Sequence, residues 1–471
     1  MTRITLVAPE DALRDVLVRV ADTGTVEIDL PDRRQASPGE AAARLQHAGR
    51  TPSAPALNAE RPDLDRLEQV GRYDLLAGEA QLEEYAAAAA RRPGVAGLAG
   101  WIPAKRLPGV AASVAEVGGA MVPQRHPPGI EAPTLLRDGG LRRSLTPLVQ
   151  TYGTVPYADV DPTWPAWVAY VLMFGMMFGD AGQGVILVAV ALALRVGWPR
   201  WARRYRRAWP FVGGAGVAAT GFGLLYGECF GPTGLVPTLW LDPLSHPMTL
   251  LLVATGIGVI LLALAYCLGT INRWREGGWL AALYAPSGVA GISFFLGAGA
   301  AAAGWYLHQA LLVRAGTPVA VAGLALALIG FIAGAGGGAG MMQASVEAFD
   351  FVVRLGSNVV SFTRLAAFGL THAALGMLVW EGTRALWARG GVLAVAGVIL
   401  FAAGTALAFS LEALVAAIQA LRLEYYELFS RVFLAQGRPF RPWHVPLATG
   451  HVAATPERES VPVFSVGEGG A

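Results

Sequence analysis

The chain has 471 residues, of which 54% are hydrophobic and only 15% are charged, and its net charge is +2. Soluble globular proteins carry about 25% charged residues, so the composition excludes an ordinary soluble protein and indicates a polytopic membrane protein. Lys105 is the only lysine and the net charge is small, so no nucleic-acid partner is expected. The two cysteines, Cys229 and Cys267, lie in or beside apolar runs and do not indicate a disulfide framework. We expect neither a metal nor a cofactor.

Polar residues gather in the first part of the chain and in the tail, which predicts a soluble N-terminal lobe followed by a membrane domain. The N-terminus, MTRITLVAPEDALRDVLVRV, lacks the pattern of a signal peptide, so the lobe is expected in the cytoplasm. Alternating and helical patterns predict a small α+β lobe with a shortened helical hairpin over residues 1–124, followed by a tether over 125–162. The expected elements are strands at 2–8, 25–30 and in VAGLAGWIP, helices at 10–22, 64–91 and 110–117, and a proline-rich linker at 31–61 with one or two helical turns around Gly39 to His47.

The membrane domain is predicted over residues 163–430, with a cytoplasmic tail over 431–471. Its first apolar run, 164–197, would be ~50 Å long as one helix, well beyond the ~30 Å hydrocarbon core. Gly179, Asp180 and Gly182, within GDAGQG, supply a turn that divides this run into two helices. The division also places the arginine-rich loop after it on the same side as the lobe, as the positive-inside rule requires. We therefore predict about eight helices with both termini in the cytoplasm, from apolar runs at 164–197, 209–229, 248–271, 279–307, 317–342, 356–383 and 390–424.

Charged residues inside the last two apolar runs need an explanation. Arg364 lies within an apolar segment, where an arginine costs at least ~2.5–3.5 kcal/mol. With ~100° per residue, Ser357, Ser361 and Thr371 fall within about 60° of Arg364, and His372 about 80° away. In the next run Glu412, Gln419 and Arg422 share an arc of about 80°. The sequence predicts polar stripes on two neighbouring helices.

Simpler interpretations of these residues remain open. Arg422 at a helix end can snorkel to the interface, and Arg364 can form a structural ion pair with Glu412. Glu412 needs a partner or a proton in any case. Asp180 is most simply a turn residue or a helix cap, whereas His372, beside Arg364, is slightly favoured as a member of a proton relay.

Three stretches resemble one family. YGTVPYADVDPT with LMFGMMFGDAGQG, SFTRLAAFGLTHAAL, and LEALVAAIQALRLEYYELFSRVFLAQGRPFRPW are similar to the membrane-embedded subunit a of vacuolar and archaeal-type rotary ATPases, called subunit I in bacteria. The resemblance implies that Arg364 and Arg422 face a rotating ring of c subunits. It also implies that Glu412, Gln419 and His372, with Ser361 on the same stripe, line two aqueous half-channels for H⁺ or Na⁺.

The resemblance further implies a non-catalytic stator in a prokaryotic plasma membrane, surrounded by lipid. Its partners would be the c-ring (proteolipid) subunits, peripheral-stalk and central-stalk subunits and, through these, the soluble catalytic A/B sector. The chain has no G-x-x-x-x-G-K-[ST] loop, so nucleotide hydrolysis would belong to those partners. It departs from the family in its short cytoplasmic half, which leaves open how peripheral stalks hold it. The alternatives are a stand-alone secondary transporter or channel, and a scaffold that has lost transport.

Overall fold

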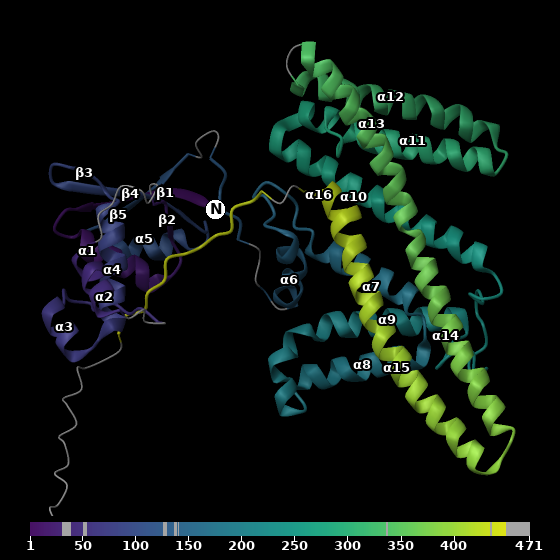
Figure 1. Ribbon diagram of the computed structural model, residues 1–471. Helices are drawn as coiled ribbons and strands as arrows, with labels where there is room; N and C mark the ends of the chain where they lie inside the picture. The colour runs from purple at the N-terminus through teal and green to yellow at the C-terminus, as the bar shows by residue number, and fades with distance from the viewer. Residues whose placement is uncertain are drawn as a thin grey trace, which may run out of the picture. The chain divides into compact units, whose positions relative to one another are not determined.

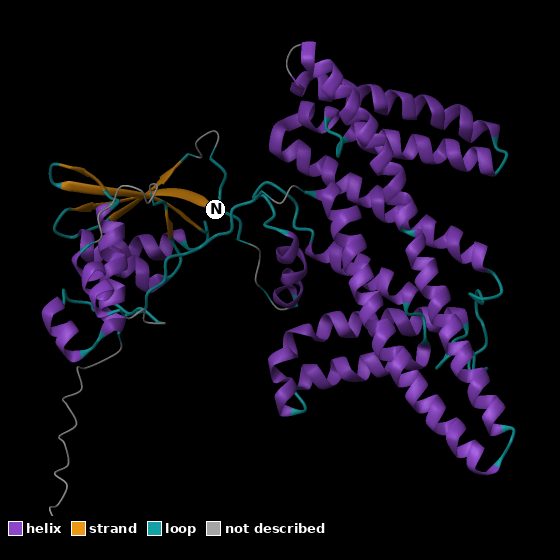
Figure 2. Ribbon diagram, viewed as in Figure 1, coloured by secondary structure: helices purple, strands orange, loops and turns teal. Residues whose placement is uncertain are grey.

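The computed structural model describes residues 1–30, 39–49, 54–125, 130–135, 139, 141–335, 338–433 and 436–448. The chain is mainly helical, as Figure 2 shows, and its strands form one small antiparallel sheet. Two compact units can be distinguished. Unit 1 comprises Met1–Ala132 with Phe440–Ala471, and unit 2 comprises Pro133–Pro439.

Unit 1 is built on a five-stranded antiparallel sheet with the order β2-β4-β1-β5, to which β3 is added beside β4. Alternate residues of the first strand, Ile4, Leu6 and Ala8, are buried, as expected for a sheet with one covered face. Gly100 lets the second strand approach closely, because a Cβ there would lie 2.6 Å from a backbone oxygen of Glu27. The strands are β1 Thr2–Pro9, β2 Glu27–Ile28, β3 Ala90–Arg92, β4 Val95–Ile102 and β5 Ala120–Gln124.

The helices of unit 1 bury one face each, and α1 contributes Val16, Leu17 and Val20 to the core. The single helix predicted over 64–91 is wrong. Gly71 adopts the left-handed conformation (φ 74°) and ends a short first helix, and the following helix stops before β3. The helices are α1 Leu13–Thr23, α2 Glu40–Ala48, α3 Leu64–Val70, α4 Tyr73–Ala87 and α5 Leu107–Ala115.

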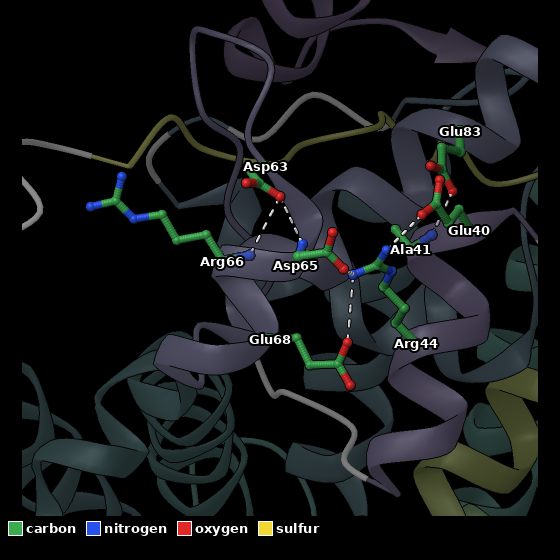
Figure 3. A network of polar contacts seen from close by, with 8 residues as sticks. All are labelled: Glu40, Ala41, Arg44, Asp63, Asp65, Arg66, Glu68 and Glu83. Atoms are coloured by element: carbon green, nitrogen blue, oxygen red, sulfur yellow. Dashed lines mark hydrogen bonds and ion pairs between the residues drawn. The ribbon is translucent and has the colours of Figure 1, made fainter.

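Part of the predicted linker is helical and is tied to its neighbours by charge. Arg44 of α2 donates to Asp65 of α3 at 2.6 Å and to Glu40 on its own helix at 2.7 Å (Figure 3). Glu83 of α4 accepts a hydrogen bond from the backbone N–H of Ala41 at 3.0 Å. These contacts join α2, α3 and α4 into one helical subdomain.

Residues 440–448 of the predicted tail pack within unit 1. Trp443 is buried, packs against the tilted ring of Tyr85 with ring centroids 4.2 Å apart, and donates its backbone N–H to the carbonyl of Val26 at 2.9 Å. Farther on, the backbone of Leu57 bonds to both Pro446 and Ala448. Residues 440–448 therefore belong to the same core as the first strand, a contact that no sequence pattern indicates.

The described part of unit 2 consists of helices joined by loops, and six of its helical segments are long and apolar enough to cross a membrane. Helices α7 and α8 are also apolar but shorter. The predicted tether contains a helix, α6, whose Leu145, Leu148 and Val149 are buried. The elements are α6 Arg142–Tyr152, α7 Thr163–Met177, α8 Ala181–Val196, η2 Arg200–Ala208, α9 Trp209–Tyr226, α10 Pro247–Tyr284, α11 Val289–Tyr306, α12 Ala310–Ala335, α13 Gly338–Ser361, α14 Thr363–Trp387, α15 Gly391–Leu423, η3 Glu424–Phe429 and α16 Ser430–Val432.

Neighbouring helices in unit 2 pack as antiparallel pairs. α8 packs against α9, α11 against α12, and the two long helices α14 and α15 run side by side (Figure 1). The α8–α9 pair is close because Gly223 faces the start of α8, where a Cβ would lie 2.0 Å from the backbone nitrogen of Ala181. The long pair α14–α15 carries most of the charged residues singled out by the sequence.

The segment around Arg364 is two helices, not the single apolar helix that was predicted. α13 ends at Ser361 and α14 begins at Thr363, and the hydroxyl of Thr363 donates back to the carbonyl of Val360 at 2.7 Å. Between them Phe362 is fully buried against Gly258 of α10. As a result Ser361 lies on α13, whereas Arg364 and His372 lie on α14.

Candidate functional site

A first polar group lies where α14, α15 and the start of α8 meet, and we call it the histidine cluster (Asp180, Gln183, His372, Glu412). His372 is 4% exposed. Its Nδ1 is in hydrogen-bond contact with a carboxylate oxygen of Glu412, and its Nε2 lies 4.0 Å from Asp180 Oδ2. One imidazole ring therefore connects carboxylates from two different helices.

Asp180 is held rigidly by the backbone. It caps α8 by accepting a hydrogen bond from the N–H of Gln183 at 2.8 Å, and its other oxygen accepts one from the N–H of Gly231 at 2.8 Å. Its side chain is fully buried. The break between α7 and α8 thus delivers a fixed carboxylate to the ring of His372.

Three residues of the histidine cluster, Gln183, His372 and Glu412, line a small cavity of about 10 Å³, roughly the space that one water molecule needs. Glu412 Oε1 and Gln183 Oε1 are buried and have no hydrogen-bond partner among the described residues. Glu228, which closely follows α9, is also buried, and its backbone carbonyl accepts a hydrogen bond from the N–H of Ala181, next to Asp180, at 2.9 Å. The region therefore combines several proton-binding groups with unfilled hydrogen-bonding capacity.

The second polar group, which we call the arginine site (Arg364, Glu427), is formed where α14 begins and α15 ends. Arg364 Nη2 donates to Glu427 Oε1 at 3.4 Å. Glu427 is 5% exposed, whereas the side chain of Arg364 keeps 26% of its surface exposed, and its buried Nη1 has no partner among the described residues. The cation is thus only partly neutralised and remains accessible at one edge.

A π-helical turn, η3, brings Glu427 to this position. The turn spans Glu424–Phe429 and inserts one extra residue per turn between α15 and α16. Such turns are rare and often occur at functional sites, because they re-aim side chains within a continuous helix. Here the result is that Glu424 and Glu427 are both buried.

Arg422 and Gln419 occupy a different environment. Arg422 is exposed, and Gln419 is half-buried with an unpartnered Oε1. Arg422 continues a row of exposed apolar residues along α15 at helical spacing, consisting of Leu407, Leu411, Leu414 and Ile418, which we call the α15 stripe. On α14, exposed small residues follow Arg364 at similar spacing, namely Ala367, Thr371 and Ala374.

Comparisons with known proteins show the family of the chain. The profile of the V-type ATPase 116kDa subunit family matches residues 91–210 and 337–445. The second match contains α14, α15 and η3. The chain belongs to this V/A-type ATPase subunit family.

Curated members of the subunit I family are similar over much of the chain. The A-type ATP synthase subunit I of Aeropyrum pernix is 28% identical over 63% of this chain and 49% of its own length, and that of Thermococcus kodakarensis is 27% identical over 74% and 53%. The V-type ATP synthase subunit I 2 of Treponema pallidum is 33% identical over 28% of the chain and 32% of its own length. The chain spans about half the length of the archaeal relatives it matches.

In this member of the subunit I family, the predicted site residues contact different partners from those that the sequence suggested. His372 and Glu412 meet, together with Asp180, which the sequence assigned to a turn or cap. Arg364 does not pair with Glu412, the partner that the simpler structural interpretation gave it, but with Glu427.

Sequence reasoning missed Glu427, Glu228 and Gln183. Glu427 follows Glu412 by 15 residues, and on an ideal helix it falls about 60° from Glu412 on the side away from Arg422, so the predicted polar arc gives no signal for it. Glu228 and Gln183 carry no such signal either, since they reach the histidine cluster only through the packing of α8 and α9.

Proposed function

We propose that this chain is the membrane-embedded stator subunit of a V/A-type rotary ATPase, in which it forms two ion half-channels against the c-ring. The observation that carries the proposal is Arg364, a partly exposed and partly neutralised cation on an apolar helix pair. A fixed cation beside a ring carboxylate favours the ionised form and so promotes release of the bound ion. The same cation prevents a continuous proton wire between the half-channels.

The surface that meets the ring is proposed to be formed by α14 and α15. The small exposed residues after Arg364 permit close approach of another helix. The α15 stripe adds large apolar side chains beside them and ends at Arg422, which places a second cation at the edge of the same surface. Arg364 and Arg422 would then interact in turn with carboxylates on passing c subunits.

The histidine cluster and the arginine site are proposed to belong to different half-channels. His372 lies eight residues after Arg364 on α14, which separates them by ~12 Å along the helix. Asp180 of the histidine cluster is bonded to Gly231, in the arginine-poor loop that the positive-inside rule places outside the cytoplasm. We assign the histidine cluster, with Glu228 and Gln419, to the half-channel on that side, and Glu427 to the cytoplasmic side.

The proposed topology has eight membrane helices, with α7 and α8 as a short hairpin added to the six longer segments. At 15 and 16 residues these two helices are ~22–24 Å long, enough to span when the bilayer thins slightly. Both termini then lie in the cytoplasm, where unit 1 would contact stalk subunits. ATP hydrolysis or synthesis is assigned to the catalytic A/B sector, and the host membrane to a prokaryotic plasma membrane.

The test is ion transport by the complex reassembled with its c-ring, stalks and A/B sector in proteoliposomes. Arg364→Ala is expected to abolish ATP-driven acidification or Na⁺ uptake while the complex still assembles. Arg384→Ala, which removes an exposed arginine from the far end of the same helix, is the matched control and should retain transport. Normal pumping by Arg364→Ala would contradict the proposal, and so would transport by the purified chain alone, which is the behaviour of a secondary transporter.

A further inference from the structure

A pocket of about 360 Å³ lies between α7, α10 and η3, separate from the histidine cluster. Its walls are apolar and include Ala169 of α7, Ala265 of α10 and Leu428 of η3. Its volume falls within the range of small-molecule sites. Among its lining residues Glu424 is the one with an ionisable side chain.

No contact within the described part of the chain accounts for the burial of the Glu424 carboxyl group. It is 1% exposed, and its Oε2 has no hydrogen-bond partner among the described residues. Glu427, three residues later on the same π-turn, is paired with Arg364. A buried carboxyl group needs a proton, a cation or several donors, and Glu424 lines the pocket with an oxygen that no described residue satisfies.

The pocket opens on the apolar surface of the helices. Val168 of α7 and Leu264 of α10, which line it, are 53% and 56% exposed, and Trp164 is 37% exposed at the start of α7. A tryptophan at a helix end is typical of the membrane interface. An occupant therefore reaches the pocket from the lipid phase and needs an apolar body.

We propose that this pocket binds a single-chain amphiphile with a primary ammonium head, whose ammonium group pairs with Glu424 and whose chain lies between α7 and α10. An ammonium supplies three N–H donors and the positive charge that a carboxylate requires. The apolar walls accept the chain and leave no second polar anchor. The pocket involves neither Arg364 nor His372, so this proposal does not depend on the proposed transport function.

Photolabelling of the full chain in lipid nanodiscs tests the proposal. The probe is dodecylammonium with a diazirine in the chain, and the matched probes are the corresponding dodecanol and dodecyl sulfate. We expect saturable labelling of the Thr163–Met177 and Pro247–Tyr284 peptides by the ammonium probe, displaced by excess unlabelled dodecylammonium. Glu424→Gln should weaken this labelling about 10-fold or more, the effect of losing one charge-assisted hydrogen bond.

Two further variants make the test specific. Ala265→Leu fills the pocket without touching the carboxylate and should also abolish saturable labelling. Glu228→Gln, the same chemical change at a buried carboxylate outside the pocket, should leave it unchanged. Equal labelling by the dodecanol probe, unchanged labelling of Glu424→Gln and Ala265→Leu, or labelling that never saturates would each overturn the proposal.

Discussion

The coupling free energy between Arg364 and Glu427 can be predicted from the geometry of their ion pair. At 3.4 Å and an effective dielectric constant of about 20, two unit charges attract by ~5 kcal/mol. Desolvation offsets much of this attraction, the contact is a single N–O pair, and the Arg364 side chain keeps 26% exposure. We therefore expect a net coupling of about 1–3 kcal/mol.

A double-mutant cycle measures this coupling. Glu427→Gln, Arg364→Gln and the double variant are purified in detergent, and their free energies of unfolding are compared in mixed micelles containing SDS. Each single variant should lose stability, because one buried charge is left without its partner. The double variant should lose less than the sum of the two, by the coupling energy.

The cycle on His372 and Glu427 is the control, because no contact joins these two residues among the described ones. Their effects should add within about 0.5 kcal/mol. An additive result for Arg364 and Glu427 as well would refute the pairing and, with it, the assignment of Glu427 to the arginine site.

Three further predictions concern other parts of the chain. Asp180→Ala removes two backbone hydrogen bonds at 2.8 Å from a fully buried carboxylate and should lower the free energy of unfolding by about 1–3 kcal/mol in the same assay, whereas Asp242→Ala, at a less buried loop carboxylate, should cost less. Burial and the neighbouring Glu276 raise the pKa of Asp159 from 3.8 to about 7, so the folded chain holds more protons than the unfolded chain in that interval and loses stability as pH rises through it. The free energy of unfolding of Asp159→Asn should therefore rise relative to that of the wild type by more than about 1 kcal/mol as the pH increases from 5 to 8. A difference between the two proteins that stays constant across this range would contradict the assignment. Trp443→Ala should destabilise unit 1 by about 3–5 kcal/mol in thermal unfolding, and an unchanged melting temperature would show that the segment 440–448 does not pack there.

The class of protein and the two key helices could be predicted because their signals are local. An arginine in a long apolar run is conspicuous whatever surrounds it, and so are Glu412 and His372. No proline or glycine marks the helix break at Phe362 in the sequence, because the break arises from the packing of Phe362 against Gly258.

The partners of the charged residues could not be predicted in the same way. The ideal helical period fails at the π-turn, where one extra residue re-aims Glu427 toward Arg364. Asp180 reaches His372 only because Gly223 allows α9 to pack closely on the start of α8. Such contacts depend on tertiary structure, and periodicity within one element carries no information about them.

Disulfide cross-linking to the ring tests the central claim most directly. Ile418→Cys, on the α15 stripe, is combined with a cysteine one turn from the carboxylate of a c subunit in the assembled complex. We expect a rapid cross-link that stops ATP hydrolysis and is reversed by reduction, whereas Leu311→Cys, an apolar and even more exposed position on α12, should form none. Cross-linking at Leu311→Cys but not at Ile418→Cys would contradict the claim that the surface carrying Arg364 and Arg422 faces the ring.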